Sequence, residues 1–319
     1  MEIKDKEFRI LVGTISYDEQ WGDRIVDGIE FGNASEEQVA ITTVSGLETP
    51  PIRNNYGDWS GRDGGYMSSQ LYSARRITIQ GFYWDKNYAC DLESVQRGDF
   101  PYSVREKLAN YLKIRQRYPI FIRFMSGRVF YTSGFMIDFK MDYEFVRSGE
   151  YQITFLCPNY ELSVADIYGD PDSIWHRAEL HKEIFGGHLV PEDLPVLFEA
   201  GRHPTVINYE GLIPHYPTIT LQGPSTNPIF YNTATNKYFR LGNPESPEEY
   251  FSIVAGQSLK IDMRNRQALV NGKSVSMAID PNSDWWYLTP GENKIYMLSQ
   301  YGSDTPVAEI VWSVDYQGA

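Results

Sequence analysis

A chain of 319 residues is longer than a single hydrophobic core usually fills, so two domains are expected. The formal net charge of −13, with no Lys/Arg block, argues against nucleic acid or an anionic membrane surface as the partner. The N-terminal MEIKDKEF has no apolar signal stretch and no apolar run reaches the roughly 18 residues of a membrane helix, which predicts a soluble protein made in the cytoplasm. Aromatic residues make up 14% of the chain, and many short alternating runs favour a mainly β fold.

Residues 1–160 are predicted to form an α+β domain with one main helix on a sheet. The predicted strands, identified by alternation of apolar and polar residues, are Phe8 to Ile15, Arg24 to Phe31, Val39 to Val44, the run beginning at Ala74, Tyr118 to Met125, Val129 to Phe139 and Tyr151 to Leu156. The helix is predicted over Ser103 to Arg117, because Ser103 and Glu106 form a capping box before an apolar stripe at helical spacing.

Between two of these strands lies a segment near residues 46–73 that is rich in Gly, Ser and Asn and has neither helical nor strand periodicity. A loop this long inside a compact domain is usually functional or disordered. A phosphate site would need a helix after the loop, whereas a strand follows. Calcium would need alternating carboxylates, a spacing that Asp58 and Asp63 lack. The segment is therefore interpreted as an extended partner-binding arm.

Five side chains of this arm are of the types that anchor protein interfaces. They are Tyr56, Trp59, Tyr66, Met67 and Tyr72. We expect them to contact another subunit, with the arm becoming ordered as it binds. The alternative is that they fold back on their own domain as an ordered surface loop.

Residues 161–201 are predicted to form an acidic connector, since Glu161 to Ala200 carries 9 acidic against 2 basic residues. A short helix is expected from near Pro171 to Gly186-Gly187. All five histidines of the chain lie in or near this connector, at His176, His181, His188, His203 and His215. Metal binding is one interpretation. Solvated histidines are preferred, because no pair has the i, i+4 spacing of two ligands on one helix.

Residues 202–319 are predicted to form an all-β sandwich. The predicted strands are Thr218 to Gln222, Leu259 to Met263, Ile295 to Leu298 and Ala308 to Val314. Asn271-Gly272, between two short runs of strand-forming residues, predicts a two-residue hairpin turn. Trp285, Trp286 and Tyr287 suit either a saccharide-stacking surface or a core, and alternation along a strand places at least one pair in the core.

The sequence contains no compact catalytic motif. G-x-G-x-x-G, the Walker loop, H-E-x-x-H, G-x-S-x-G and C-x-x-C are all absent from it. Cys90 and Cys157 lie far apart without metal-type spacing, so two small buried side chains are expected in place of a disulfide. We therefore expect no catalytic residues, no cofactor and no metal site.

Three regions together resemble the distal tail proteins of long, flexible-tailed bacteriophages. LETPPIRNNYGDWSGRDGGYMSSQLYSARRITIQGFYW looks like the Gly-rich extended loop and following strand of that family. NYEGLIPHYPTITLQGPSTNPIFYNTATNKYFRLG, followed by GQSLKIDMRNRQALVNGK and DWWYLTPGENKIYML, is similar to its C-terminal galectin-like sandwich. The resemblance covers nearly the whole chain, apart from the acidic connector.

This resemblance implies a structural virion protein at the phage tail tip, without enzymatic activity. Six copies would form a ring that joins the tail tube protein to the tail-tip or baseplate proteins, which include a tail-associated lysin and a receptor-binding protein. The first domain would make the ring, and the galectin-like domains would project outward.

Two rival hypotheses remain from the residues themselves. One is a carbohydrate-binding module that recognises host cell-wall saccharides through Trp285, Trp286 or nearby tyrosines. The other is a wall-degrading enzyme whose catalytic acids the sequence does not reveal, since its 42 carboxylates allow a catalytic pair to be placed almost anywhere.

Overall fold

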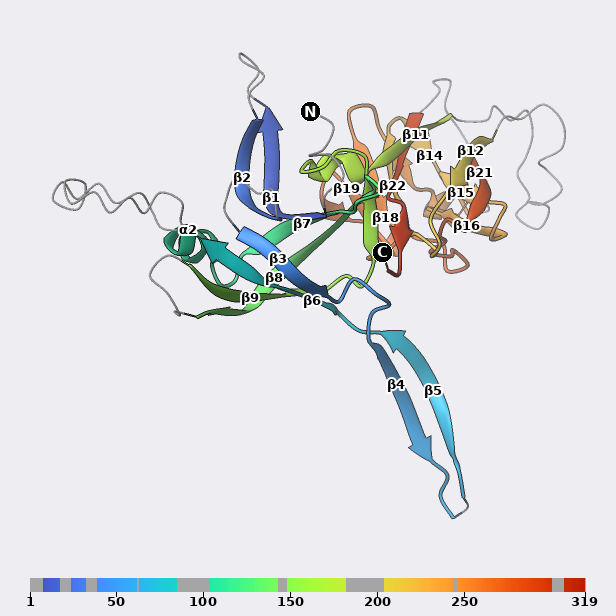
Figure 1. The fold of residues 1–319 in the computed structure, drawn as a ribbon. Coiled ribbons are helices and arrows are strands. Elements are labelled where there is room, and N and C mark those ends of the chain that lie inside the picture. The colour runs from blue at the N-terminus through green and yellow to red at the C-terminus, as the bar shows by residue number, and fades with distance from the viewer. Residues whose placement is uncertain are drawn as a thin grey trace. The chain divides into compact units, whose positions relative to one another are not determined.

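The fold is described from a computed structural model, which covers residues 8–17, 24–32, 39–61, 63–84, 104–142, 148–181, 204–243, 246–299 and 307–318. The described residues are dominated by antiparallel strands, so the predicted mainly β fold class is confirmed (Figure 1). The chain divides into two compact units, Met1–Ile174 with Tyr316–Ala319 and Trp175–Asp315. No helix in the described ranges is long and apolar enough to cross a membrane.

The first unit is built on a nine-stranded sheet. Its strands are β1 (Arg9–Tyr17), β2 (Arg24–Phe31), β3 (Val39–Ser45), β6 (Arg75–Trp84), β7 (Arg117–Arg123), β8 (Val129–Met141), β9 (Ser148–Cys157), β10 (Leu162–Ala165) and β23 (Asp315–Tyr316). The main order is β2-β1-β7-β8-β9-β6-β3, and β10 pairs with β8 and β23. At the two edges, the Gly32 amide donates to the Val39 carbonyl at 2.9 Å, which draws the ends of β2 and β3 together.

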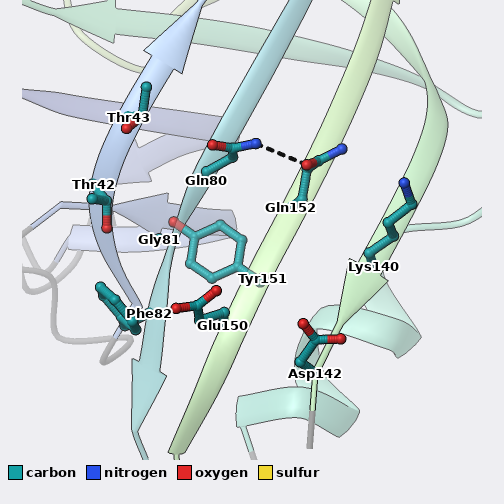
Figure 2. Close-up of a pocket in the computed structure, with 10 residues that line it drawn as sticks. All are labelled: Thr42, Thr43, Gln80, Gly81, Phe82, Lys140, Asp142, Glu150, Tyr151 and Gln152. Carbon is teal, nitrogen blue, oxygen red and sulfur yellow. Dashed lines mark hydrogen bonds between the residues drawn. The ribbon is translucent and has the colours of Figure 1, made fainter.

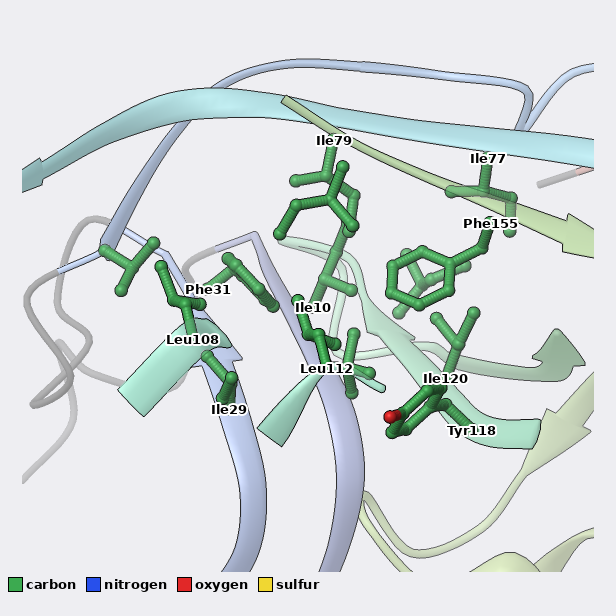
Figure 3. Close-up of a cluster of buried hydrophobic side chains, with 14 of the residues drawn as sticks. Ile10, Ile29, Phe31, Ile77, Ile79, Leu108, Leu112, Tyr118, Ile120 and Phe155 are labelled. Carbon is green, nitrogen blue, oxygen red and sulfur yellow. The ribbon is translucent and has the colours of Figure 1, made fainter. Parts of the chain in front are cut away.

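One face of this sheet is covered by α2 (Val104–Tyr111), the one α-helix among the described residues. Leu108 of this helix and Leu112, just after its end, point towards isoleucine and aromatic side chains of the sheet (Figure 3). Burying side chains of this size stabilises the fold by about 1.5–3 kcal/mol each. The core also holds Cys157, whose thiol has its pKa raised to about 11 by burial. Cys90 lies outside the described residues.

The helix is shorter than the predicted Ser103 to Arg117, and the buried Tyr118 explains why. Its hydroxyl donates to the Tyr111 carbonyl at 2.8 Å and accepts the Lys113 amide at 2.6 Å. One tyrosine from β7 thus satisfies a carbonyl and an amide that another helical turn would have used. Arg115 then adopts a positive φ of 65°, which turns the chain into β7. The predicted cap, Ser103, lies outside the described residues.

The predicted loop near residues 46–73 is largely a two-stranded hairpin, which corrects the sequence-based interpretation. β4 (Ile52–Asp58) and β5 (Gly65–Tyr72) pair only with each other, as a separate two-stranded sheet (Figure 1). We call residues 52–72 the arm hairpin. Alternation failed to predict it because neither face is buried, so no polar and apolar period is imposed on the sequence.

The second unit contains two larger sheets and one short strand pair. Its strands are β11 (His176–His181), β12 (Thr205–Tyr209), β13 (Thr218–Gln222), β14 (Ser225–Thr226), β15 (Ile229–Asn232), β16 (Lys237–Arg240), β17 (Ser252–Ile253), β18 (Ser258–Asp262), β19 (Gln267–Val270), β20 (Lys273–Ser274), β21 (Gly291–Leu298) and β22 (Val307–Trp312). The sheets run β11-β22-β13-β18-β19-β20 and β12-β21-β15-β16, with β14 paired to β17. Short 3-10 helices occur at Pro247–Glu249 and Ser276–Ala278.

Both larger sheets of this unit carry rows of fully buried apolar side chains, the pattern expected of a sandwich core. Ile219 and Ile310 are buried in one sheet, and Phe230 and Phe239 in the other. The predicted Asn271-Gly272 turn between β19 and β20 is confirmed, with φ values of 46° and 80°. Positive φ at both positions matches the twist of the flanking strands.

The predicted helix near Pro171 in the acidic connector is wrong. A four-residue 3-10 helix, Pro171–Ile174, is followed by β11, which pairs along its whole length with β22. The run HRAELH alternates, with Leu180 buried and Glu179 exposed, and tertiary pairing selects strand over helix for such a short run. The unit boundary falls at Ile174, inside the predicted connector, whose residues 182–201 lie outside the described ranges.

Candidate functional site

The arm hairpin carries the largest group of exposed apolar side chains in the described part of the chain. The exposed fraction reaches 76% at Tyr56 and 59% at Met67. The other members, each at least 36% exposed, are Ile52, Trp59, Tyr66, Leu71 and Tyr72. Surface patches of contiguous large apolar side chains mark interaction sites more often than not. An isolated two-stranded hairpin is also only marginally stable in water, so contact with a partner would stabilise this one.

A bulge in β5 decides which side chains share a face of the hairpin. The register pairs Asn55 with Ser69 but Tyr56 with Met67, leaving Ser68 as the extra residue. Because side chains alternate between faces, one extra residue reverses the phase of every position beyond it. Met67 therefore joins the face of Tyr56, where regular alternation from Tyr72 would have placed it on the opposite face.

Both of the resulting faces carry exposed apolar side chains, but the two differ in content. By register, Ile52, Tyr56, Met67 and Tyr72 belong to one face, which we call the Tyr56 face. Tyr66 belongs to the other, where its ring lies 5.2 Å from that of Trp59. The hairpin can thus be covered on either side, as expected for an element inserted between partners.

The tip of the hairpin depends on glycines. The Trp59 amide donates to the Gly64 carbonyl at 3.1 Å, and Gly61 and Gly64 have φ values of 79° and 94°. Residues with a Cβ are strained in this region of φ. The Gly-rich sequence that could have been a ligand loop therefore lies at the connection between two strands of a hairpin.

The five predicted interface residues do not occupy equivalent places. Tyr56 and Met67 pair on one face, whereas Trp59 and Tyr66 contact each other near the tip. Tyr72 lies at the root, where its ring stacks on Tyr160 at 4.9 Å. Tyr72 thus contacts its own unit, as the fold-back alternative expected.

Sequence reasoning missed Ile52 and Leu71, which are 50% and 51% exposed on the hairpin. Both lie at the ends of a stretch that lacked strand periodicity. The signal that could have found them is the pair of glycine-flanked runs around GRDGG, read as a hairpin rather than as a loop.

A shallow hollow lies on the open face of the nine-stranded sheet, over β3, β6, β8 and β9 (Figure 2). Gln80 donates to Gln152 at 2.8 Å, and the Lys140 ammonium lies 3.4 Å from the Asp138 carboxylate. Its other lining groups include Asp142 and Glu150. Gln80 and Gln152 thus bond to each other across β6 and β9, and the hollow is an open surface feature rather than an enclosed ligand site.

Beneath this face, Gly81 allows an uncommonly close approach of two strands. A Cβ at Gly81 would lie 1.8 Å from the Ala40 carbonyl oxygen and 2.8 Å from the Tyr151 hydroxyl. That hydroxyl donates to the same carbonyl at 2.9 Å. Burial raises the pKa of Tyr151, which favours the neutral hydroxyl as the hydrogen-bond donor.

A Ser–His–Asp cluster is buried in the second unit, but its geometry is that of a structural network. His215 Nδ1 lies 2.6 Å from Asp315 Oδ2, as in a catalytic triad. The Ser313 hydroxyl, however, donates to Asp315 Oδ1 at 2.8 Å, and the Ser313 backbone amide donates to His215 Nε2 at 3.3 Å. A nucleophile would need its hydroxyl on Nε2 and a path to substrate, and all three residues are buried.

The three residues proposed to contact saccharides differ in how deeply they are buried. Trp286 is fully buried and its indole Nε1 donates to the Phe230 carbonyl at 3.1 Å, so its assignment as a saccharide contact is wrong. Trp285 and Tyr287 are half-buried, the former with its ring 4.7 Å from that of Phe239. The alternation argument, which placed one pair in the core, explains this difference.

The histidines give no support for a metal site within the described residues, where no cluster of three or more His, Cys, Asp or Glu side chains could hold an ion. His215 belongs to the buried network, and the His176 ring stacks on Trp312 at 5.9 Å. His188 and His203 lie outside the described ranges, as does the side chain of His181.

Residues 210–316 match the family model of the siphovirus-type tail component, C-terminal domain, and these residues make up most of the second unit. The second unit is therefore similar to the C-terminal domain of siphovirus-type tail components. The resemblance to distal tail proteins predicted from the sequence is confirmed.

Comparison with solved structures bears on the fold. The crystal structure of the Dit protein of phage SPP1, described as a paradigm of the hub adsorption apparatus in phages infecting Gram-positive bacteria, is 13% identical, with a TM-score of 0.53. The alignment covers 85% of this chain and 91% of that chain, so the two share a fold. A chain of the activated phage P2 baseplate with Ca aligns at 8% identity over 96% and 97% of the two chains, with a TM-score of 0.40. No curated protein sequence matches the chain.

Proposed function

We propose that this protein is the distal tail hub of a siphovirus, a structural virion protein that assembles as a ring of six copies. The ring would join the tail tube to the tail-tip or baseplate proteins that carry host adsorption, including a tail-associated lysin and a receptor-binding protein. The match of residues 210–316 to the tail-component family supports a place in the phage tail. The observation that carries the assembly is the arm hairpin with its exposed apolar residues on both faces.

The arm hairpin suits a ring because a ring contact is heterologous. A head-to-tail interface that closes by rotation uses two different surfaces of each copy. The hairpin provides one such surface, and a different region of the next copy receives it. Tyr56, Trp59, Tyr66 and Met67 are the proposed anchors, since large aromatic and methionine side chains dominate the energy of such interfaces.

Catalysis is not part of the proposed function. In the Ser–His–Asp cluster His215 Nε2 accepts the Ser313 backbone amide rather than a hydroxyl. In the hollow of the first unit, Gln80 and Gln152 are hydrogen-bonded to each other. Both arrangements support a structural role for the described residues.

The mass of the purified protein tests the ring. Static light scattering or native mass spectrometry is expected to find a species near six times 36.7 kDa. We expect deletion of residues 55–68 to leave both units folded but to remove this species, because the strands of the hairpin pair only with each other. A monomer at high concentration, or an intact ring after the deletion, would contradict the proposal.

Saccharide recognition by the second unit is the alternative proposal, and the half-buried Trp285 and Tyr287 are the observation that favours it. Exposed aromatic rings stack on the apolar faces of sugars. The test is binding of purified cell-wall saccharides to the intact protein and to Trp285→Ala. Loss of binding in the variant alone would support it, and no binding by either protein would rule it out.

A further inference from the structure

The root of the arm hairpin is held by one fully buried side chain, Arg75, the first residue of β6. Its Nε and Nη2 donate to the Tyr160 carbonyl at 3.0 and 2.8 Å. Its Nη1 donates to the carbonyls of Gly46 and Glu48 at 2.6 and 2.7 Å. Nη2 also donates to the carbonyl of Gln317, near the end of the chain. Every nitrogen of the guanidinium therefore has an acceptor.

The four carbonyls come from three segments that are remote in sequence. Gly46 and Glu48 lead from β3 into the arm hairpin, Tyr160 follows β9, and Gln317 follows β23. A planar guanidinium with fixed donor directions can satisfy such a set only when all three segments are in place. Burial lowers the pKa of Arg75, in keeping with the cost of a charge away from water. Displacing one segment would leave part of a buried charge without its hydrogen bonds.

The end of the chain also contacts the hairpin root through side chains. Tyr72 is the last residue of β5, and its hydroxyl accepts a hydrogen bond from Gln317 Nε2 at 2.8 Å. A Cβ on Gly318 would lie 3.2 Å from the backbone of Leu47 and Glu48, so the end of the chain lies directly against the segment entering β4. Residues 317–318 thus contact both the end of β5 and the segment that leads into β4.

An aromatic contact fixes this terminal segment to the sheet itself. The Tyr316 ring packs edge-on against Phe130 at 5.8 Å, and the Arg128 guanidinium carbon lies 5.3 Å from the centre of the Tyr316 ring. The terminal segment is therefore joined to β8 on one side and to the hairpin root on the other.

We propose that Tyr316–Gly318 form a strap that fixes the direction of the arm hairpin, with Arg75 as the residue that holds strap and hairpin root together. The proposal deepens the proposed function and rests on it, because an arm that joins subunits binds more tightly when its direction is set beforehand. Preorganisation removes the entropic cost of ordering the hairpin at the moment of contact.

Amide hydrogen exchange in the full chain tests the strap. Truncation after Asp315 is expected to raise exchange about tenfold or more at the hairpin root, because the hydrogen bonds lost there involve a charged donor. The reporter is the Ser73 amide, which donates to the Pro51 carbonyl at 2.8 Å and closes the root. Exchange in β1 and β7 is expected to stay unchanged.

One milder variant and one control accompany the truncation. Gln317→Ala removes the side-chain bond to Tyr72 but keeps the carbonyl that Arg75 binds, and we expect a smaller rise, about threefold, at the same root amides. Arg76→Lys is the matched control, since Arg76 is the exposed neighbour of Arg75 on β6 and its change is expected to leave the root unaffected.

Hydrogen exchange tests the strap and the mass of the assembly tests the ring, so the two proposals can fail independently. A rise confined to the root supports the strap whatever the mass of the assembly. Unchanged root exchange after truncation, or a rise spread evenly over β1 and β7, would overturn it. Failure of the wild-type chain to form the ring would count against the proposed function alone.

Discussion

The double substitution Tyr56→Ser with Met67→Ser is expected to abolish ring assembly while leaving both units folded. The two side chains are paired on the Tyr56 face and are the most exposed apolar groups of the hairpin strands. At about 2 kcal/mol for each hot-spot side chain, the pair would weaken every subunit contact roughly a thousandfold. Light scattering across a concentration series measures the loss.

The matched control for this variant is Asn54→Ser with Gln70→Ser. These residues form the adjacent pair on the same face and are polar. We expect the control to assemble like the wild type, because interface energy concentrates in large apolar side chains. Both variants should unfold at the wild-type temperature, since surface changes usually alter stability by less than about 0.5 kcal/mol. Equal assembly by the two variants would show that the Tyr56 face makes no contact.

Trp286→Ala is expected to destabilise the second unit by about 4 kcal/mol, the range found for large-to-small changes at buried aromatic residues. The substitution empties a fully buried site and leaves the Phe230 carbonyl without its indole donor. For a unit of this size the loss corresponds to a fall in melting temperature of about 10–15 °C. In calorimetry of the intact protein, the unfolding transition of the second unit would move to lower temperature and that of the first unit would not.

Trp285→Ala is the matched comparison, because it removes the same side chain one residue away. Trp285 is half-buried and packs on Phe239, so we expect a cost of about 1–2 kcal/mol. If the two variants unfold at the same temperature, the placement of Trp286 in the core is contradicted.

Most predicted strands begin and end within about two residues of the observed ones. β2 and β13 match their predicted ranges. In β13 alternate residues are buried, and this one-sided burial imposes a period of two on the sequence. The same reasoning placed Leu108 and Leu112 on the buried stripe of the helix. Strong periodicity reflects burial, so it is readable wherever an element lies against a core.

The helix end and the connector show where local patterns lose to tertiary contacts. The apolar stripe alone extended the helix to Arg117, whereas the Tyr118 hydroxyl ends it near Tyr111. The run after Pro171 was compatible with a helix, and pairing with β22 made part of it a strand. Each outcome depends on a partner that is distant in the fold or in the sequence, which no local pattern contains.

The candidate site divides in the same way. The sequence by itself determined a Gly-rich segment bearing interface-type aromatic residues, because composition expresses what a segment can contact. Only the tertiary structure decided that Ser68 is bulged, that Met67 therefore shares a face with Tyr56, and that Trp286 is enclosed. In the sequence, nothing distinguishes Arg75 from other arginines in strands. Its special place is visible only in the structure, where it donates to four carbonyls from three remote segments. Residue types are local, whereas register, burial and the acceptors around a buried charge arise only when remote parts of the chain meet.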